Sequence, residues 1–150
     1  MAVWAAGAAL SVLVLAGCTP APAPTEAVPS SPVTPAPTQT RGAVHPDGSA
    51  ADNLGLFTAV TLEVWGSADR ARGRAYIDAL AAAGFDRSAM QVTADASTVG
   101  NAAESLQFSV RWGDECLVGQ VGAATGEPVT AVLPGLADGA CLVGRTQPID

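Results

Sequence analysis

The chain has 150 residues, and its seven basic residues are all Arg, against fourteen Asp and Glu, which gives a formal net charge of −7. Because affinity for nucleic acid comes mainly from neutralising phosphates, this acidic balance argues against nucleic acid as a partner. It also disfavours electrostatic docking onto anionic lipid, so a membrane location needs another kind of anchor.

The N-terminus has the features of such an anchor. Residues 2–16 form an apolar run that spans about 22 Å as a helix, short of the roughly 30 Å hydrocarbon core of a bilayer. The run is therefore interpreted as part of a signal peptide over residues 1–17, not as a transmembrane helix. It ends in Leu15-Ala16-Gly17-Cys18, which matches the bacterial lipobox. This motif predicts cleavage before Cys18 and a lipid on Cys18 that anchors the chain at the extracellular face of the cell membrane.

Alternatives remain open at this end of the chain. No Lys or Arg precedes the apolar run. Either the coding sequence starts upstream of Met1, or the signal works with minimal charge. A further alternative is that Cys18 is a free thiol at the end of a short uncleaved anchor.

Residues 18–50 are rich in Pro, Ala and Thr and contain almost no large apolar residue. Such a segment cannot offset the cost of ordering by burial, which predicts a disordered linker. With polyproline II character it would reach up to about 100 Å and hold the following domain away from the membrane. The single histidine, His45, lies here and is expected to be a solvated linker residue.

Residues 51–150 are predicted to form a small extracytoplasmic domain that begins with two helices. The first starts near Asp52, although its second half, residues 60–64, also alternates like a strand. The second is expected over about residues 68–83, because Ser67 is a suitable N-cap. Gly84 stands where a helix needs a left-handed residue, and Phe85 is expected to fold back onto the helix.

Strands follow the helices. Residues 105–112 alternate between apolar and polar, Gly113-Asp114 is a two-residue turn signal, and residues 115–121 form the return strand. This register places Arg111 opposite Cys116 and Trp112 opposite Glu115. Residues 90–94 and 140–144 are two further strand candidates, and loops are expected around residues 125–128 and 134–135. The predicted fold class is α+β, with two N-terminal helices on one face of a three- to four-stranded, mainly antiparallel sheet.

The pattern QFSVRWG-x-x-CLVGQ, with a second CLVG near the C-terminus, resembles an uncharacterised family of small secreted actinobacterial lipoproteins. Their C-terminal domain has no established function, and the resemblance covers about residues 51–150. It implies a lipid-anchored domain in which Cys116 and Cys141 are a fixed pair. It provides no catalytic residues.

The sequence around Cys116 and Cys141 excludes two of the roles that a pair of cysteines can have. Two Cys without a domain His do not make a zinc site, and a separation of about twenty-five residues is not a Cys-x-x-Cys redox motif. A secreted context favours a structural disulfide, and free thiols are the alternative. We predict no metal and no cofactor.

Two functional hypotheses follow from the remaining residues. The first is a binding or scaffolding module that contacts an envelope protein or a wall component through Arg111, Trp112, Asp114 and Glu115, since Trp and Arg are enriched at interface hot spots. Trp112 is also interpreted as a residue at the edge of the core. The second is an envelope hydrolase that uses paired carboxylates on glycans. Its candidates, which are otherwise interpreted as a solvated acidic surface, are Asp86, Asp95, Glu104, Asp114 and Glu115.

Overall fold

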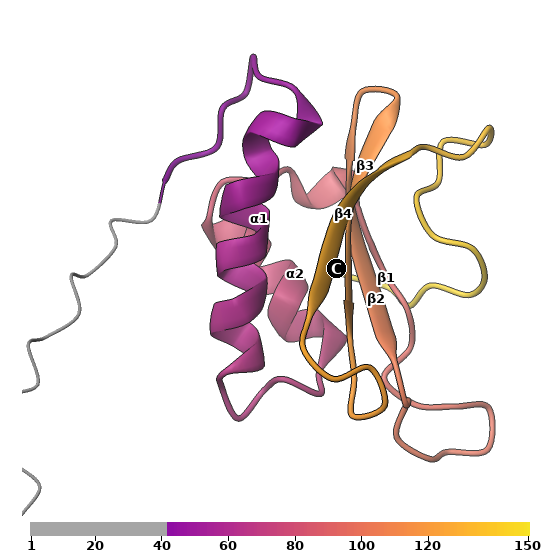
Figure 1. The fold of residues 1–150 in the computed structure, drawn as a ribbon. Coiled ribbons are helices and arrows are strands. Elements are labelled where there is room, and N and C mark those ends of the chain that lie inside the picture. The colour runs from indigo at the N-terminus through magenta and orange to yellow at the C-terminus, as the bar shows by residue number, and fades with distance from the viewer. Residues whose placement is uncertain (1–41) are drawn as a thin grey trace, which may run out of the picture. The chain divides into compact units, whose positions relative to one another are not determined.

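The computed structural model describes residues 42–150, so the predicted signal peptide, Cys18 and most of the predicted linker lie outside the described residues. Within that range two helices cover one face of a four-stranded antiparallel sheet (Figure 1), which confirms the predicted α+β class. The elements are α1 (Ala50–Trp65), α2 (Gly73–Ala82), η1 (Arg87–Ala89), β1 (Met90–Val92), β2 (Leu106–Trp112), β3 (Glu115–Val121) and β4 (Val129–Pro134).

Helix α1 begins with a reciprocal cap. The Ser49 side chain accepts a hydrogen bond from the backbone N–H of Asp52, and the Asp52 carboxylate accepts one from the backbone N–H of Ser49. This capping box satisfies two N–H groups that a helix N-terminus otherwise leaves without partners. The alternating stretch in residues 60–64 is helical, because Val60 and Val64 both fall on the face that α1 buries.

The folded part begins before residue 51. The buried Asn53 side chain accepts a hydrogen bond from the backbone N–H of His45 (2.8 Å) and donates to the His45 carbonyl (3.0 Å). Val44 also packs against the core. The His45 side chain is exposed, as expected for a solvated residue, but its backbone is not part of a free linker, because the Asn53 side chain binds both its N–H and its carbonyl.

Helix α2 begins at Gly73, not near residue 68 as predicted. Ser67 accepts a hydrogen bond from the N–H of Asp69, but it does so within a turn that precedes the helix. The first N–H of α2, at Gly73, instead donates to the Asp95 carboxylate (2.8 Å), which comes from the loop after β1. The helix start is thus set by a residue distant in sequence.

The C-terminal end of α2 confirms the prediction. Gly84 has a φ of 105°, a left-handed conformation that glycine adopts without steric cost. The N–H of Phe85 donates to the Leu80 carbonyl (3.1 Å), and both side chains are buried in one core cluster. This is the Schellman arrangement of a helix end.

The sheet has the order β1-β2-β3-β4. The β2–β3 hairpin has the predicted register, with Arg111 opposite Cys116 and Trp112 opposite Glu115. The fourth strand is β4, within a stretch that we did not predict as a strand, whereas the candidate at residues 140–144 is wrong. Those residues do not join a ladder, because the backbone N–H groups of Cys141 and Leu142 both donate to the side-chain oxygen of Gln91.

The core lies between the helices and the sheet and is centred on aromatic rings. Tyr76 of α2 stacks on Phe108 of β2 with ring centroids 4.4 Å apart, and Phe57 of α1 packs beside Phe108 at 5.7 Å. Gly119 on β3 leaves room for the Phe108 ring, which a Cβ at this position would overlap. Burial of these large apolar side chains is the main term that stabilises the fold.

The C-terminal segment, residues 135–150, first passes over the sheet face opposite the helices, which we call the outer face (Figure 1), and its last two residues reach Arg74 of α2 and Arg87. A disulfide joins Cys141 of this segment to Cys116 of β3, with their Cα atoms 5.8 Å apart. The disulfide prediction is confirmed over the free-thiol alternative. Further along, the N–H of Gln147 donates to the Val92 carbonyl (2.9 Å), which holds the segment along the edge of β1.

Candidate functional site

The structure places Arg111 and Trp112 on opposite faces of β2. The Trp112 ring packs edge-on against Phe85 (6.2 Å between centroids), and its indole N–H donates to the Gly48 carbonyl (2.8 Å). Arg111 lies on the outer face, where its Nε donates to the Gly113 carbonyl (2.5 Å). The residues are neighbours in sequence, but the alternation of side chains along a strand separates them.

Asp114 and Glu115, the other two predicted binding residues, lie exposed at the β2–β3 turn. Asp114 is in a long ion pair with Arg111 (4.0 Å), and its side chain is fully solvent-exposed. Arg111, Asp114 and Glu115 thus share one end of the hairpin, whereas Trp112 belongs to the edge of the core.

The remaining carboxylates proposed for glycan hydrolysis occupy separate local settings. Asp86 caps η1 by accepting a hydrogen bond from the Ser88 N–H (2.9 Å). Asp95 is held by the N–H of Gly73 and by the side chain of Gln147. Glu104 is exposed on the loop before β2. The first two carboxylates therefore have structural roles, and no single cleft of residues 42–150 collects this set.

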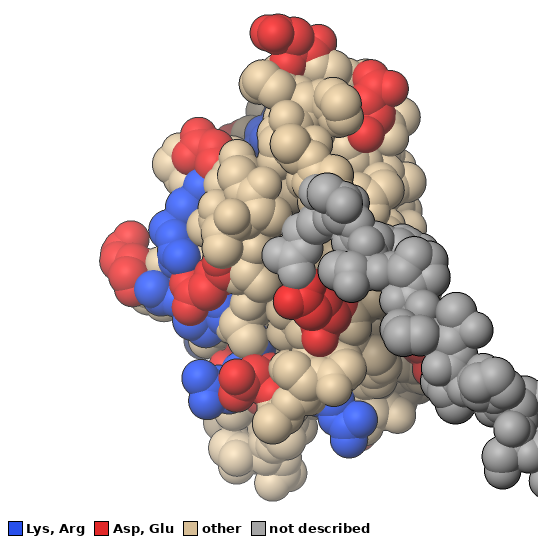
Figure 2. All heavy atoms as spheres, turned by 90° about the vertical axis from the view of Figure 1, so that its left-hand side faces the viewer, with Lys and Arg blue, Asp and Glu red and all other residues tan. Residues whose placement is uncertain are grey.

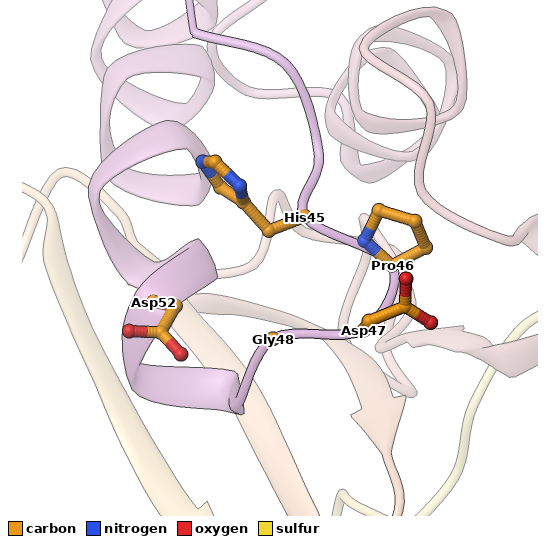
Figure 3. Close-up of a pocket in the computed structure, with 5 residues that line it drawn as sticks. All are labelled: His45, Pro46, Asp47, Gly48 and Asp52. Atoms are coloured by element: carbon orange, nitrogen blue, oxygen red, sulfur yellow. The ribbon is translucent and has the colours of Figure 1, made fainter.

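A hollow of about 350 Å³ lies at the turn before α1, lined by residues 45–48 and Asp52 (Figure 3). The His45 ring and the carboxylates of Asp47 and Asp52 point in different directions in Figure 3. Asp52 is engaged by Ser49, whose side-chain and backbone hydrogen bonds lower the pKa of the Asp52 carboxyl. The geometry is that of a helix cap and does not bring three ligands to one point.

Charges on the side of the helices are paired. Figure 2 shows acidic and basic side chains interleaved there, without an extended basic surface on that face. Arg72 pairs with Asp69 (3.3 Å), and Arg74 pairs with Asp78 (3.1 Å). Arg72 and Arg74 thus each have an acidic partner on their own segment.

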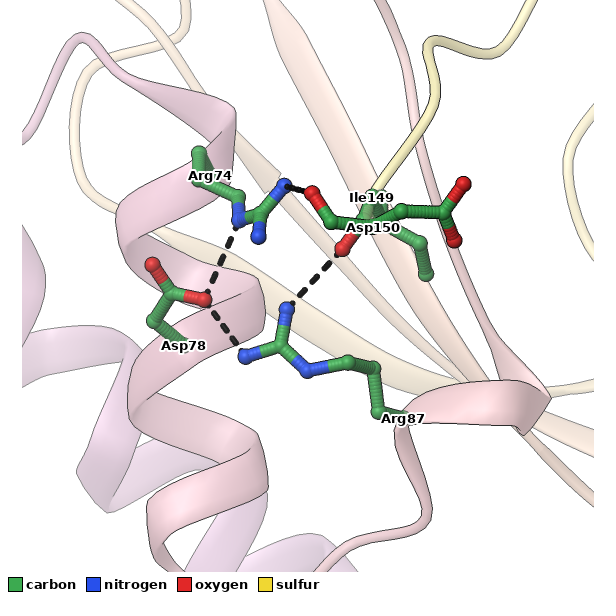
Figure 4. Close-up of polar contacts among 5 residues, drawn as sticks. All are labelled: Arg74, Asp78, Arg87, Ile149 and Asp150. Carbon is green, nitrogen blue, oxygen red and sulfur yellow. Dashed lines mark hydrogen bonds and ion pairs between the residues drawn. The ribbon is translucent and has the colours of Figure 1, made fainter.

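Asp78 is also the centre of a tether for the C-terminal segment (Figure 4). It pairs with Arg87 (2.5 Å), and Arg87 donates in turn to the Ile149 carbonyl (3.0 Å). Arg74 donates to the Asp150 carbonyl (2.7 Å). The hydrogen bond from Arg87 and then that from Arg74 lower the pKa of Asp78. This network has a structural role.

A further hollow lies at the opposite end of the domain from the β2–β3 turn. Three connections meet there, residues 66–72 between the helices, residues 93–105 before β2 and residues 122–128 between β3 and β4 (Figure 1). They enclose about 530 Å³, which is within the range of small-molecule sites. Four Ala residues line this loop-end pocket together with Trp65, Arg70, Leu106, Gly122, Gly126 and Glu127.

Contacts with neighbouring elements fix two of the connections that form the loop-end pocket. The Tyr76 hydroxyl donates to the Arg70 carbonyl (2.8 Å), and the Arg70 guanidinium lies over the Trp65 ring at 5.6 Å. Gly122 lies so close to the backbone at Glu104 and Ser105 that any side chain there would collide with it. Two of the three connections are thereby fixed against neighbouring elements, as a preformed site requires.

Arg70 and Glu127 give the loop-end pocket one charge of each sign. Neither forms an ion pair with the other or with any other residue in the part of the chain that the structure describes. Sequence reasoning did not find this site, because its residues come from three separate connections and match no motif. The only available signal was composition: Trp65 at the end of α1 and Arg70 in the connection after it are accompanied by two later connections rich in Ala and Gly.

Residues 42–150 contain no cluster of three or more His, Cys, Asp or Glu side chains with the geometry of a metal site. None of the helices in this range is long and apolar enough to cross a membrane. In comparisons with known proteins, one family model, the domain of unknown function DUF6993, matches residues 61–145. No curated protein and no solved structure matches the chain.

Proposed function

The chain belongs to the DUF6993 family, whose model covers more than half of its length, and on that premise we propose that it is a binding module of the cell envelope. In this proposal a lipid on Cys18 anchors it at the extracellular face of the membrane, and the Pro-rich linker holds residues 42–150 away from the bilayer. Its partner is an envelope protein or a wall component.

The observation that carries the proposal is the loop-end pocket. It is a hollow with mostly apolar walls and two charges that no described side chain neutralises, whereas the charges beside α2 are paired. Connections held on a rigid scaffold are the usual location of binding residues. An apolar hollow with a few polar groups is likewise the expected form of a binding site.

Site-specific photocrosslinking in intact cells tests this proposal. A photoreactive residue at the exposed position 123, at the loop end, is compared with one at the exposed position 114, at the hairpin turn. We expect a discrete adduct from position 123 and none from position 114. An adduct from position 114 alone would place the binding surface on Arg111, Asp114 and Glu115, and no adduct from either position would refute the binding role.

The anchor has its own test. Cells expressing the wild type or Cys18→Ala are fed a clickable fatty acid, and the protein is isolated by an affinity tag. We expect label on the wild type and none on the variant, with the variant released from the membrane fraction. Label retained by the Cys18→Ala protein would contradict lipidation at this residue.

A further inference from the structure

We propose that the loop-end pocket binds a short zwitterionic peptide, with its carboxylate at Arg70, its ammonium group at Glu127 and an apolar side chain against Trp65. This inference rests on the proposed binding function and adds the chemical class of the ligand.

The residues that line the pocket favour a ligand with a small apolar group. Four Ala side chains and two Gly residues line the pocket, and Leu106, which is buried, lies at its base. Short side chains leave space between the connections, and the indole of Trp65, with Arg70 over its ring, forms part of the wall. A ligand made only of charged or hydroxyl groups would lose water at these walls without an apolar contact in return. A peptide with an aliphatic side chain gains that contact.

The two charged residues of the pocket favour a ligand that carries one positive and one negative charge. Arg70 and Glu127 line the same pocket but form no ion pair with one another in the described structure. Two opposite charges that border one hollow without meeting leave a gap for a ligand that carries the complementary pair. A guanidinium group is well suited to a carboxylate because it can donate two parallel hydrogen bonds to it.

The supports keep Arg70 available for the ligand. Its backbone is held by the Tyr76 hydroxyl, and its guanidinium lies against the indole of Trp65, not against a carboxylate. Glu127 precedes Pro128, whose ring limits the backbone conformations of the residue before it. Both charges are thus carried by restrained backbone, which reduces the ordering cost of binding.

The test uses the purified full chain with ¹⁵N-labelled tryptophan and the dipeptide Ala-Leu as the probe. The indole signal of Trp65, assigned with Trp65→Phe, reports the pocket. The indole signal of Trp112, which is hydrogen-bonded to Gly48 near the hairpin turn, serves as the internal control. We expect a saturable shift of the Trp65 signal and an unchanged Trp112 signal. The doubly capped peptide N-acetyl-Ala-Leu-amide is expected to bind at least about tenfold more weakly than Ala-Leu.

Singly capped peptides assign each charge. Arg70→Gln is expected to weaken the anionic N-acetyl-Ala-Leu about tenfold and leave the cationic Ala-Leu-amide unchanged, whereas Glu127→Gln does the reverse. The matched controls are Arg72→Gln on the same connection, which is paired with Asp69 outside the pocket, and Glu115→Gln at the opposite end. Neither control is expected to change binding.

Two outcomes overturn the inference. One is a Trp65 signal that does not move with Ala-Leu, and the other is equal affinity for the zwitterionic and doubly capped peptides. If either occurs while the in-cell adduct from position 123 remains, the ligand class is wrong and the binding function stands. If the adduct is also absent, the binding function is wrong as well.

Discussion

At the scale of single residues, Asn53 joins the segment before α1 to the domain. It is fully buried, and its side chain accepts from the His45 N–H and donates to the carbonyls of His45 and Ser49. A buried amide with three partners satisfies backbone groups that would otherwise lose their hydrogen bonds on burial. Asn53 thereby determines where the folded part of the chain begins.

Replacing Asn53 with Ala is expected to lower the free energy of unfolding by about 2–3 kcal/mol, because three backbone groups lose their partner. Urea denaturation followed by tryptophan fluorescence measures the change. Asn101→Ala, at an exposed loop position, is the control and should change stability by less than about 0.5 kcal/mol. Equal midpoints for the two variants would show that residues 44–49 do not contribute to the fold.

Two glycines with opposite surroundings provide a second prediction. A Cβ at Gly119 would overlap the Phe108 ring, whereas a Cβ at Gly55, on the exposed side of α1, meets nothing within 4 Å. Gly119→Ala is therefore expected to destabilise the protein by about 1–3 kcal/mol, and Gly55→Ala to stabilise it by up to about 1 kcal/mol. Thermal unfolding of both variants should shift in opposite directions, and a shift of the same sign would contradict the packing around Phe108.

At the scale of elements, the disulfide fixes the C-terminal segment to β3. It joins positions 25 residues apart and, with Gln91, holds residues that form no strand of their own. In the loop-entropy model such a crosslink contributes about 3–4 kcal/mol, because it restricts the unfolded chain.

Reduction of this bond is expected to lower the free energy of unfolding by about 3 kcal/mol. The double variant Cys116→Ala/Cys141→Ala should have the lower stability with or without reductant, and the wild type should approach it only after reduction. Denaturant curves under both conditions measure this. A wild type that is indifferent to the reductant, with its thiols shown to be alkylatable, would contradict the stabilising role.

The same scale explains which elements could be predicted from the sequence. The register of the β2–β3 hairpin was predicted correctly, because strand alternation and a two-residue turn signal are local. The start of α2 was misplaced because Asp95, a partner from another element, determines it. Residues 140–144 have a strand-like pattern, but Gln91 and a disulfide bind them in place of a neighbouring strand.

The candidate site could not be predicted from local sequence patterns, because its residues are also distant from one another in the sequence. Trp65 at the end of α1, Leu106 at the start of β2 and Glu127 in a connection line one pocket only because these elements meet at one end of the domain. The sequence instead pointed to the turn after β2, where Trp and Arg are adjacent. Their adjacency in a strand is what places them on opposite faces.

At the scale of the whole molecule, stability is expected to depend on pH at both extremes. Hydrogen bonds from Ser49, Arg87 and Ser88 lower the pKa values of Asp52, Asp78 and Asp86, respectively, below 3.8. Burial raises the pKa of Tyr76 from 10.0 to about 12. A lowered carboxyl pKa stabilises the fold above 3.8 and loses its contribution as the pH falls. The raised phenol pKa stabilises it below 10.0 and loses its contribution as the pH rises towards 12.

The free energy of unfolding is therefore expected to be nearly constant between about pH 5 and 9 and to fall on either side. Urea denaturation at pH 7, 3 and 11 measures the profile. Asp78→Asn should be less stable than the wild type at pH 7 and lose less stability between pH 5 and 3, because its side chain no longer takes up a proton. An unchanged acid slope in this variant would contradict the role of the Asp78 network.

The contacts of the C-terminal segment also govern the order of events during folding. The hydrogen bonds from Arg74 to the Asp150 carbonyl and from Arg87 to the Ile149 carbonyl span 76 and 62 residues of chain. Contacts of such long range close late, because the intervening chain must first be arranged. The helices and the hairpin can assemble while the chain is still emerging, but the tether of α2 must wait for residues 149–150. Until Cys141 has also reached the outer face, the thiol of Cys116 has no disulfide partner, so the unfinished domain is then open to misassembly with other chains.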